Sequence, residues 1–391
     1  MTTKNIIVYT IMFIGLFTYG VWITFGTFLG KNPVQAVVDY SNERNENPVL
    51  VDKCSDKPAL DLAGATVPEI VRLDEHQKVC KSFVTDEIMT FALMPKDKTE
   101  AVKMADTMAI ALKEYSKYGI KPLVIIEPEA SWGLIDFLEF ERGFYNPFLT
   151  LYFNQLRANG ITDSMMGTWV PFPEANTPLW NKQNSTPKDF VGCINIYLGI
   201  LRSYYPTAKT SILLNSATYP NEDTNYLKGE YVSLIPYLDG IKPGLVDSFG
   251  MQGFPWSPAK GENEREVNDI RVFLPSRLLE EAADKLAVKE VWINTGTYST
   301  KYTNNADITV YVAPEARKAI LKEIITLGKD LQAKGYTVKV NLFNEDKSET
   351  AEATDWSYFL NADNITRHTV IYVEMMALFS SSGIQFSQFD I

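Results

Sequence analysis

The residues best suited to chemistry follow a β-rich run that ends near residue 174. The segment 168–180 reads T-W-V-P-F-P-E-A-N-T-P-L-W, so that Glu174, Asn176 and Trp180 come within seven residues of one another. A carboxylic acid can move a proton to or from a sugar oxygen, an amide can bind a hydroxyl group, and an indole ring can stack on the apolar face of a pyranose. The segment therefore predicts a carbohydrate site in which Glu174 transfers the proton.

Short β-type runs alternate with helical patterns along the chain from residue 89 onward. Eight strands alternating with helices predict an α/β fold, a (β/α)8 barrel of the TIM type. A doubly wound open sheet is the alternative fold, but no glycine-rich phosphate-binding loop follows the first strand. The predicted strands are 89–94, 122–127, 167–172, 210–214, 246–251, 290–294, 337–343 and 384–389. The predicted helices are 99–118, 144–159, 187–204, 264–286, 314–334 and 364–380, with a weaker link at 215–244.

Polar residues and tryptophans collect where these strands end. In a (β/α)8 barrel the carboxyl ends of the strands form the face that carries active sites. Any one of these residues alone would more often be ordinary surface, but their concentration on one rim favours a site. We expect Trp132, Trp180 and Trp256 to line one groove, and Trp169 and Trp180 to form an apolar wall that raises the pKa of Glu174. The polar residues at the strand ends are Glu127, Glu129, Glu174, Asn176, Asn215, Gln252, Asn294 and Asn344 to Asp346.

The C-terminal run at 384–389 has an unusual place in this scheme. It follows the helical pattern at 364–380, so a right-handed crossover would lay it parallel beside the strand at 337–343. No convincing strand precedes 89–94, and we therefore expect a circularly permuted barrel that the C-terminal strand closes, with Asp390 at the rim. The alternative is a frayed tail and a barrel that takes its strand from residues 31–80.

The N-terminal residues predict a membrane anchor. Ile6 to Leu29 is a largely apolar stretch of 24 residues without a charged side chain, which is long enough to cross a bilayer. Lys4 precedes it, and no clear cleavage site follows, so an uncleaved signal anchor is favoured over a removed signal peptide. We expect 1–30 to be the anchor, 31–82 a stalk, and 83–391 a barrel on the extracytoplasmic side of the cell membrane.

Composition narrows the classes of partner. The 37 basic and 48 acidic residues give a formal net charge of −11, and no basic run interleaves with aromatics, which disfavours nucleic acid as a partner.

The cysteines and histidines indicate a disulfide and no zinc site. In an oxidising compartment Cys54 and Cys80 form the plausible disulfide, and Cys193 lies in an apolar helical pattern as a buried thiol. His76 and His368 lack zinc-ligand spacing to any cysteine pair. We expect neither a metal nor a cofactor.

Several motifs in this order resemble glycoside hydrolase family 26, the retaining β-glycanases that include β-mannanases. The resemblance covers roughly residues 83–360. It implies that Glu174 is the acid/base residue and that a β-linked polysaccharide or oligosaccharide is the partner. The motifs are P-L-V-I-I-E-P-E at 122–129, P-F-P-E-A-N-T-P-L-W at 171–180, the helix at 187–202, V-D-S-F-G-M-Q-G-F-P-W at 246–256 and V-K-V-N-L-F-N-E-D-K at 338–347, followed by Asp355 and Trp356.

The departures from the family pattern fall on the chemistry. The family has His before the acid/base, where this chain has Pro173, and an orienting Tyr where it has Phe254. Asn294 stands where the nucleophilic Glu is expected, within V-W-I-N-T-G. An amide cannot attack an anomeric carbon as a carboxylate does, so double displacement through Asn294 is excluded.

Three functions stay open from the sequence. One is a glycosidase in which Glu174 is the acid and Glu345 or Glu127 takes the second role. Another is a carbohydrate-binding protein that keeps the cleft without the reaction, and the last is a membrane-tethered scaffold for a protein partner. The candidate substrate-binding residues are Asn176, Trp180, Trp132, Gln252, Phe254, Trp256 and Asn294.

Overall fold

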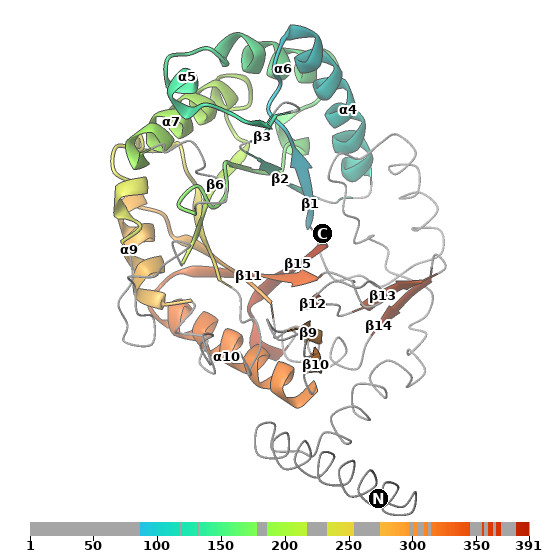
Figure 1. Ribbon diagram of the computed structural model, residues 1–391, viewed down its shortest axis with the longest axis vertical. Coiled ribbons are helices and arrows are strands. Elements are labelled where there is room, and N and C mark those ends of the chain that lie inside the picture. The colour runs from blue at the N-terminus through green and yellow to red at the C-terminus, as the bar shows by residue number, and fades with distance from the viewer. Residues whose placement is uncertain are drawn as a thin grey trace, which may run out of the picture.

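A ring of parallel strands with helices along much of its outside makes up the centre of the computed structural model (Figure 1). The longer described stretches carry the ring and its helices. The structure describes residues 87–117, 119, 121–127, 129–130, 133–177, 186–216, 233–253, 274–296, 301–303, 309–311, 314–344, 354–355, 359–362, 365–368 and 381–390.

Eight strands form the main sheet in the order β1-β2-β5-β6-β7-β8-β11-β15, and every recorded pairing between them is parallel. The predicted α/β (β/α)8 fold is therefore confirmed. The strands are β1 (Glu87–Ala92), β2 (Lys121–Ile126), β5 (Thr168–Pro171), β6 (Lys209–Asn215), β7 (Ser248–Gln252), β8 (Glu290–Thr295), β11 (Thr337–Asn344) and β15 (Gln385–Asp390).

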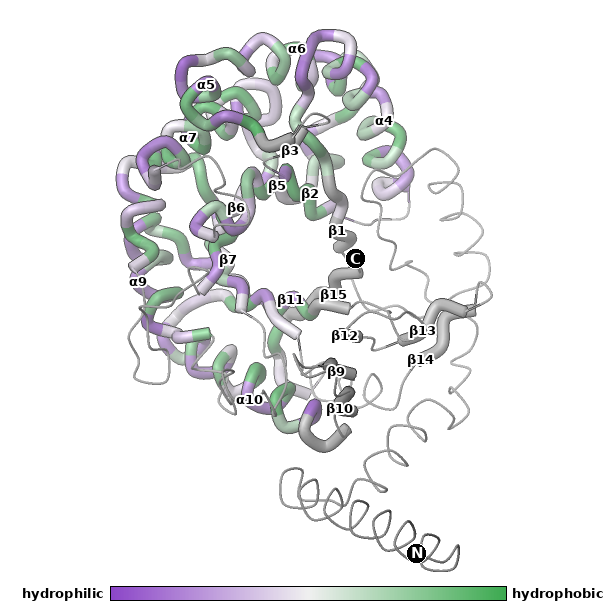
Figure 2. The backbone as a smooth tube through the Cα atoms, in the orientation of Figure 1, coloured by the Kyte–Doolittle hydropathy of each residue, from purple (hydrophilic) through white to green (hydrophobic). Residues whose placement is uncertain are grey.

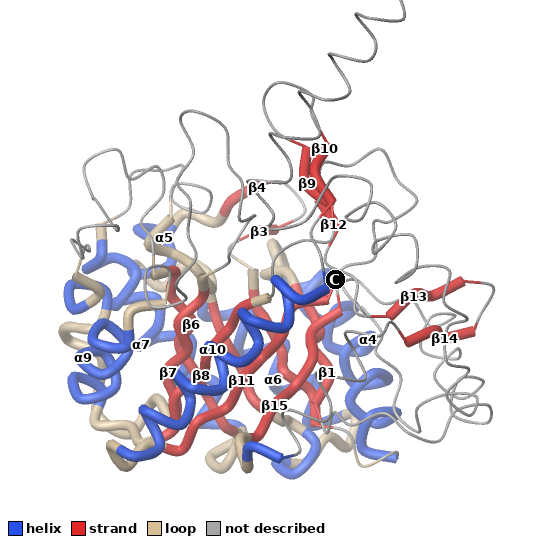
Figure 3. The backbone as a smooth tube through the Cα atoms, turned by 90° about the horizontal axis from the view of Figure 1, so that it is seen from below, coloured by secondary structure: helices blue, strands red, loops and turns tan. Residues whose placement is uncertain are grey.

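Helices lie outside the ring and alternate with its strands along the chain (Figures 1 and 3). Hydrophobic and hydrophilic residues alternate along these helices (Figure 2), as expected for helices that cover a sheet on one side and meet water on the other. The helices are α4 (Lys98–Lys117), α5 (Phe137–Glu141), α6 (Asn146–Ala158), α7 (Pro187–Tyr204), α9 (Ser276–Leu286) and α10 (Pro314–Ala333), with 3-10 turns η1 (Asp163–Met165) and η3 (Ile235–Tyr237).

Small sheets lie beyond one end of the ring, as the side view shows (Figure 3). Two of them follow β2 and β8 in the chain, so this is the end at which the barrel strands finish. A further hairpin lies beside the barrel. These pieces are β3 (Glu129–Ala130) with β4 (Gly133–Leu134), β9 (Lys301–Thr303) with β10 (Thr309–Tyr311) and β12 (Thr354–Asp355), and β13 (Phe359–Ala362) with β14 (Ile365–His368).

The strand β14 corrects one expectation, because residues 365–368 were predicted to begin a helix. Ile365 and Thr366 are β-branched, which favours a strand. The preceding sequence Asp363-Asn364 consists of residue types that favour turns. Phe359–Ala362 pairs antiparallel with Ile365–His368 and fixes the hairpin. The rest of the predicted helix at 364–380 lies outside the described residues.

The C-terminal strand occupies the last place in the ring, as expected. β15 pairs in parallel with β11 from Lys339↔Gln385 to Asn344↔Asp390. On its other side β15 lies next to β1, where the chain ends (Figure 1). Among the described residues the structure records no ladder between β15 and β1, so the ring is completed by contact at this one junction.

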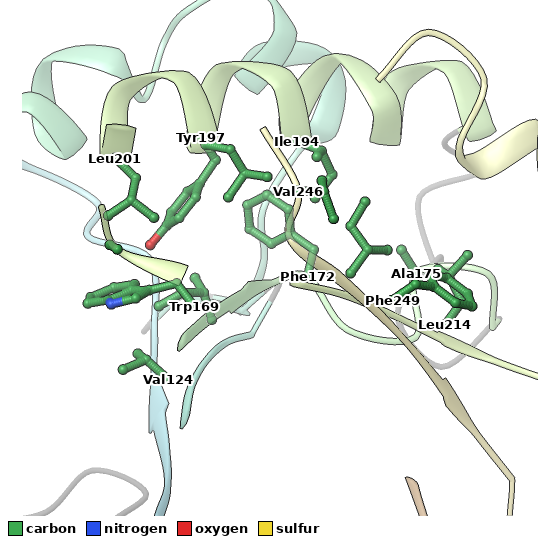
Figure 4. Packing of buried hydrophobic residues seen from close by; sticks show 14 of the residues in the cluster. Val124, Trp169, Phe172, Ala175, Ile194, Tyr197, Leu201, Leu214, Val246 and Phe249 are labelled. Atoms are coloured by element: carbon green, nitrogen blue, oxygen red, sulfur yellow. The ribbon is translucent and has the colours of Figure 1, made fainter. Parts of the chain in front are cut away.

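The outer core lies between the strands and the helices. α7 begins with a capping box, in which the Thr186 side chain accepts from Asp189 N and the Asp189 carboxylate accepts from Thr186 N. Its buried face then packs on the outward-facing side chains of the neighbouring strands (Figure 4). Cys193 belongs to this core as a buried free thiol, as the sequence predicted, and burial raises its pKa.

The inner core is a separate cluster inside the ring, made of Leu123, Ile125, Val170, Leu213 and Trp292. Because successive strand residues point to opposite sides, these alternate with residues of the outer core. Gly250 leaves room for this packing: a Cβ there would lie 3.0 Å from Leu213 Cδ1 and 3.5 Å from the Cβ of Trp292.

None of the helices within the described residues is long and apolar enough to span a bilayer. The predicted anchor at Ile6 to Leu29, the stalk at 31–82 and the Cys54–Cys80 pair lie outside those residues.

Candidate active site

Four amide side chains lie at one level across neighbouring strands. Strand register pairs Asn215 with Gln252, Gln252 with Asn294, and Asn294 with Asn341. Each follows an inner residue of its strand by two positions, so all four belong to the inner side of the ring, near the carboxyl ends of the strands. We call these four residues the amide row. In a (β/α)8 barrel this is the end at which active sites form.

The two deepest members of the amide row bond to each other. Asn341 Nδ2 donates to Asn294 Oδ1 at 2.7 Å, and the two residues are 0% and 3% exposed. Asn341 Oδ1 is buried, and none of the described residues donates a hydrogen bond to it. The Nδ2 protons of Asn294 likewise have no acceptor among the described residues. The pair therefore presents the Asn294 Nδ2 group as a donor and Asn341 Oδ1 as an acceptor, neither of which its own bond uses.

Glu174 lies just beyond β5 in an uncommon backbone conformation. Its φ of 53° is in the left-handed region, which costs a non-glycine residue on the order of 1–3 kcal/mol. Two bonds hold it there: Glu174 N donates to Leu213 O at 2.8 Å, and Thr177 N donates to Glu174 O at 2.8 Å. Strain of this kind clusters at functional sites because the surrounding structure has to maintain it.

The Glu174 carboxylate reaches the amide row. Asn215 Nδ2 donates to Glu174 Oε1 at 2.6 Å, and the side chain is half-buried. This bond fixes the direction of a half-buried carboxylate at the rim of the barrel. The structure thus brings together two residues that the sequence named separately, Glu174 and Asn215.

Asn176 holds this arrangement in place. Its Nδ2 donates to Asn215 O at 2.7 Å, and its Oδ1 accepts from Asn215 N at 2.9 Å. It is 4% exposed, and both ends of its amide are occupied by the Asn215 backbone. Asn176 therefore positions Asn215, and through it the Glu174 carboxylate, while its direct contact with substrate stays a prediction.

One layer below the amide row lies a buried lysine that the sequence interpretation missed. Lys339 is 2% exposed, and its Nζ lies 4.6 Å from the centroid of the Trp292 ring. Burial lowers the pKa of Lys339 to about 7. The alternation in V-K-V-N-L-F at 338–343 could have revealed it, because Lys339 and Asn341 share one face while Val338, Val340 and Leu342 share the other.

Trp169 corrects a second expectation, since it does not form a wall beside Glu174. Its indole belongs to the outer core, where it meets the rings of Phe153 and Tyr152 on α6 and donates from Nε1 to Met166 O at 2.8 Å. The inner residue of β5 is its neighbour Val170. Strand alternation sends the two side chains to opposite sides of the sheet.

Of the remaining predicted site residues, Glu127 and Gln252 are described by the structure and the others are not. Glu127 directly follows β2, where its N–H donates to Ala92 O at 3.0 Å, and it is half-buried at the rim on the strand next to β5. Gln252 ends β7 and is half-buried. The described residues contain no cluster of three metal-ligating side chains. Outside the described residues lie Glu345, Trp132, Trp180, Phe254 and Trp256.

This arrangement places one half-buried carboxylate, that of Glu174, beside a row of amides. Adjacent strands are about 4.8 Å apart, so β6 and β8 are separated by roughly 10 Å. The position at Asn294 carries no carboxylate, and any nucleophile there has to come from elsewhere.

No protein-family model and no curated protein matches the chain. Among solved structures it is similar to a β-glucosidase from Thermotoga maritima in complex with deoxynojirimycin, at 12% identity and a TM-score of 0.48 over 81% of this chain and 87% of that chain. It is also similar to the family 1 β-glucosidase from the same organism, at 12% identity and a TM-score of 0.46 over 76% of this chain and 84% of that chain.

A third similar structure is the exo-β-1,4-mannosidase Op5Man5 from Opitutaceae bacterium strain TAV5. The identity is 14% and the TM-score 0.48, over 76% of this chain and 53% of that chain. At these values the similarities assign neither an activity nor a family. The resemblance to family 26 therefore stays a hypothesis, and function has to be argued from the site.

Proposed function

We propose that this protein hydrolyses a β-linked glycan, with Glu174 as the residue that protonates the leaving oxygen. The observation that carries the proposal is the strained, half-buried Glu174, whose carboxylate accepts a 2.6 Å hydrogen bond from Asn215. The backbone of Asn215 is in turn held at both ends by Asn176. Such support for one carboxylate on the rim is expected where proton transfer needs a fixed direction.

The rest of the site supports sugar chemistry through its amides. Gln252 and Asn294 belong to the row that begins at Asn215, and amides bind sugar hydroxyls as donors or acceptors. Glu127 and Glu345 stay candidates for a second carboxylate that activates water. The tryptophans 132, 180 and 256 would supply stacking surfaces in this proposal.

The matched test compares Glu174→Gln with Glu114→Gln. Glu114 lies on α4, far along the chain from the rim, and forms a surface ion pair with Lys117 at 3.1 Å, a kind of contact that contributes little to stability. With aryl β-glycosides and soluble β-glycans as substrates, we expect Glu174→Gln to lower kcat by about 10²–10⁴-fold and Glu114→Gln to leave it unchanged. Equal activity of the wild type and Glu174→Gln would remove Glu174 from this role.

A carbohydrate-binding protein without catalysis is the second candidate function, which Asn294 at the expected nucleophile position favours. It predicts that soluble β-glycans change tryptophan fluorescence or electrophoretic mobility while no product forms. Binding that survives in Glu174→Gln, with no turnover in the wild type, would support this second candidate.

We also propose that residues 6–29 anchor the protein in the cell membrane, with the barrel on the extracytoplasmic side. The support is the length and apolar character of that stretch, with Lys4 before it. Removal of residues 1–30 should move the protein from the membrane fraction to the soluble fraction. Added protease should cleave the full-length protein in spheroplasts only if the barrel is exposed outside; protection of the barrel would contradict the orientation.

A further inference from the structure

The Asn294–Asn341 pair has the hydrogen-bonding pattern of a receptor for a secondary amide. Asn341 Nδ2 is used by Asn294 Oδ1, which leaves Asn294 Nδ2 as a donor and Asn341 Oδ1 as an acceptor. Asn341 Oδ1 is buried and receives no hydrogen bond from any described residue, which is costly unless a ligand supplies a donor. A secondary amide offers what is missing, because its N–H donates and its carbonyl oxygen accepts.

A glycan with this group is one built from 2-acetamido-2-deoxy sugars, in which an acetamido substituent stands next to the anomeric carbon. The pair lies on β8 and β11, and Glu174 meets the amide row at Asn215 on β6. Two strand spacings, roughly 10 Å, separate β6 from β8. A sugar ring placed between them directs its glycosidic oxygen to Glu174 and its 2-acetamido group to the pair.

The acetamido group of the substrate would also supply the nucleophile that the Asn294 position lacks. Asn294 cannot form a glycosyl ester, and the amide row contains no carboxylate. In substrate-assisted glycosidases the carbonyl oxygen of the substrate's own acetamido group attacks the anomeric carbon. An enzyme of this kind needs one proton-transferring acid and a group that orients the acetamido substituent, and both are present here.

We infer that the substrate class is a β-linked N-acetylhexosamine and that the Asn294–Asn341 pair binds its acetamido group for substrate-assisted hydrolysis, an inference that rests on the proposed function of Glu174. In the first step the acetamido oxygen forms a bond to C1, the bond from C1 to the glycosidic oxygen breaks, and the proton of Glu174 goes to the leaving oxygen. The product is a cyclic oxazolinium ion, because the acetamido nitrogen keeps its proton while Glu174 becomes a carboxylate.

In the second step Glu174 acts as the base. Water attacks C1 and gives a proton to the Glu174 carboxylate, the bond from C1 to the acetamido oxygen breaks, and the acetamido group is restored. Two displacements at C1 give overall retention of configuration. Neither step requires a metal, an oxidant or a second enzyme carboxylate.

The first experiment uses the unmodified protein and two series of aryl β-glycosides. One series carries 2-acetamido, monofluoroacetamido, difluoroacetamido and trifluoroacetamido groups, and the other carries a 2-hydroxyl group in the gluco and manno configurations. Fluorine withdraws electrons from the carbonyl oxygen, so kcat/KM should fall by about tenfold or more from the acetyl to the trifluoroacetyl substrate. Hydrolysis of the 2-hydroxyl glycosides should be far slower.

The possible outcomes distinguish a failure of the acetamido inference from a failure of the proposed role of Glu174. If 2-hydroxyl glycosides are hydrolysed as fast as 2-acetamido glycosides, or if fluorination leaves the rate unchanged, the acetamido inference is wrong while Glu174 can still be the acid. If neither series is hydrolysed, the inference and the proposed function both fail. A thiazoline analogue of the cyclic intermediate should inhibit the wild type competitively, and failure to inhibit would count against the inference alone.

A pair of variants then tests the receptor itself. Asn341→Asp keeps an acceptor for the acetamido N–H, whereas Asn341→Leu removes it. We expect KM for the 2-acetamido substrate to rise by at least about tenfold more in Asn341→Leu than in Asn341→Asp, an effect of about one hydrogen bond. Circular dichroism checks that both variants fold. Equal KM values in two folded variants would overturn the assignment of Asn341.

Discussion

The two sides of the barrel interior differ sharply in chemistry. On β2 and β5 the inner residues are mainly apolar, namely Leu123, Ile125 and Val170, with Thr168 as a small hydroxyl on the same side of β5. On β8 and β11 they include Asn294, Asn341 and Lys339, which are nearly as buried at 3%, 0% and 2% exposure. We call the first the apolar wall and the second the polar wall. Trp292 belongs to both, since it packs in the inner cluster and lies under the Lys339 ammonium.

The difference indicates which side carries function. Apolar residues fill a barrel at no electrostatic cost, so the apolar wall needs no explanation beyond packing. Burying an amine or an incompletely bonded amide is unfavourable by a few kcal/mol. The buried amine and the incompletely bonded amide both lie on the polar wall, next to the rim that holds Glu174. Unfavourable burial of this kind is expected at functional sites, so the polar wall is where we expect a ligand to bind.

The largest effect is expected where the two walls meet. Trp292→Ala removes the largest side chain of the inner cluster and should cost about 3–5 kcal/mol of unfolding free energy. Urea denaturation followed by circular dichroism measures it. Trp292→Phe keeps most of the volume and should recover more than half of the loss. A loss of less than about 1 kcal/mol of unfolding free energy in Trp292→Ala would mean that Trp292 does not pack between the apolar wall and the polar wall.

The next effect has the opposite sign. Lys339→Met replaces a buried amine by an apolar side chain of similar length and should stabilise the protein by roughly 1–4 kcal/mol at pH 7. Removing the amine ends the desolvation that lowers the pKa of Lys339 to about 7. A destabilised Lys339→Met variant would show that the lysine supports the fold and would remove the contrast between the walls.

The pH dependence of this gain follows from the direction of the shift. The folded protein binds the Lys339 proton only below about pH 7, whereas the unfolded chain binds it up to the ordinary lysine pKa of 10.5. The unfolded state therefore holds more protons between these values, and the stability of the wild type rises with pH across the window. The advantage of Lys339→Met should shrink from pH 7 to pH 10. A difference that does not change with pH would exclude a depressed pKa.

Most of the fold could be predicted from the sequence because it depends on local patterns. For all eight barrel strands, including the C-terminal strand β15, both the first and the last residue lie within two residues of the predicted bounds. Parallel strands that are buried on both faces produce short apolar runs, which are easy to separate from the longer helical patterns. The error at β14 has the same origin, since Ile365–His368 is too short to show a clear period.

The site was harder to predict because it depends on register across strands. Glu174, Asn215, Gln252 and Asn294 were found as polar residues at strand ends, and no pattern within one strand shows that three of them share a level. Asn341 was missed because it lies three residues before its strand ends. The direction of Trp169 was misjudged because the β-rich run was treated as belonging to the rim, although strand alternation turns that side chain outward.

A smaller effect is expected from the amide pair on the polar wall. Asn341→Leu leaves Asn294 Oδ1 without its donor and should cost about 1–3 kcal/mol. The double variant Asn341→Leu with Asn294→Leu removes both polar groups and should cost less than the single variant, because no buried group is left unsatisfied. A double-mutant cycle from urea denaturation measures the coupling. Additive losses would mean that the pair is not a unit.

The smallest effect is expected on the apolar wall. Ile125→Val removes one methylene group from the inner cluster and should cost about 0.5–1.5 kcal/mol. Because Ile125 lies on β2 and is 3% exposed, the substitution should leave kcat, KM and any ligand response unchanged after correction for the folded fraction. Urea denaturation and steady-state kinetics on the same preparation provide both measurements. The comparison is with Asn341→Leu on the polar wall, which is expected to cost somewhat more free energy and also to impair substrate binding. If Ile125→Val lowered binding as much as Asn341→Leu at equal stability, the function would not be confined to the polar wall, and the two sides of the barrel would have to be treated as one site.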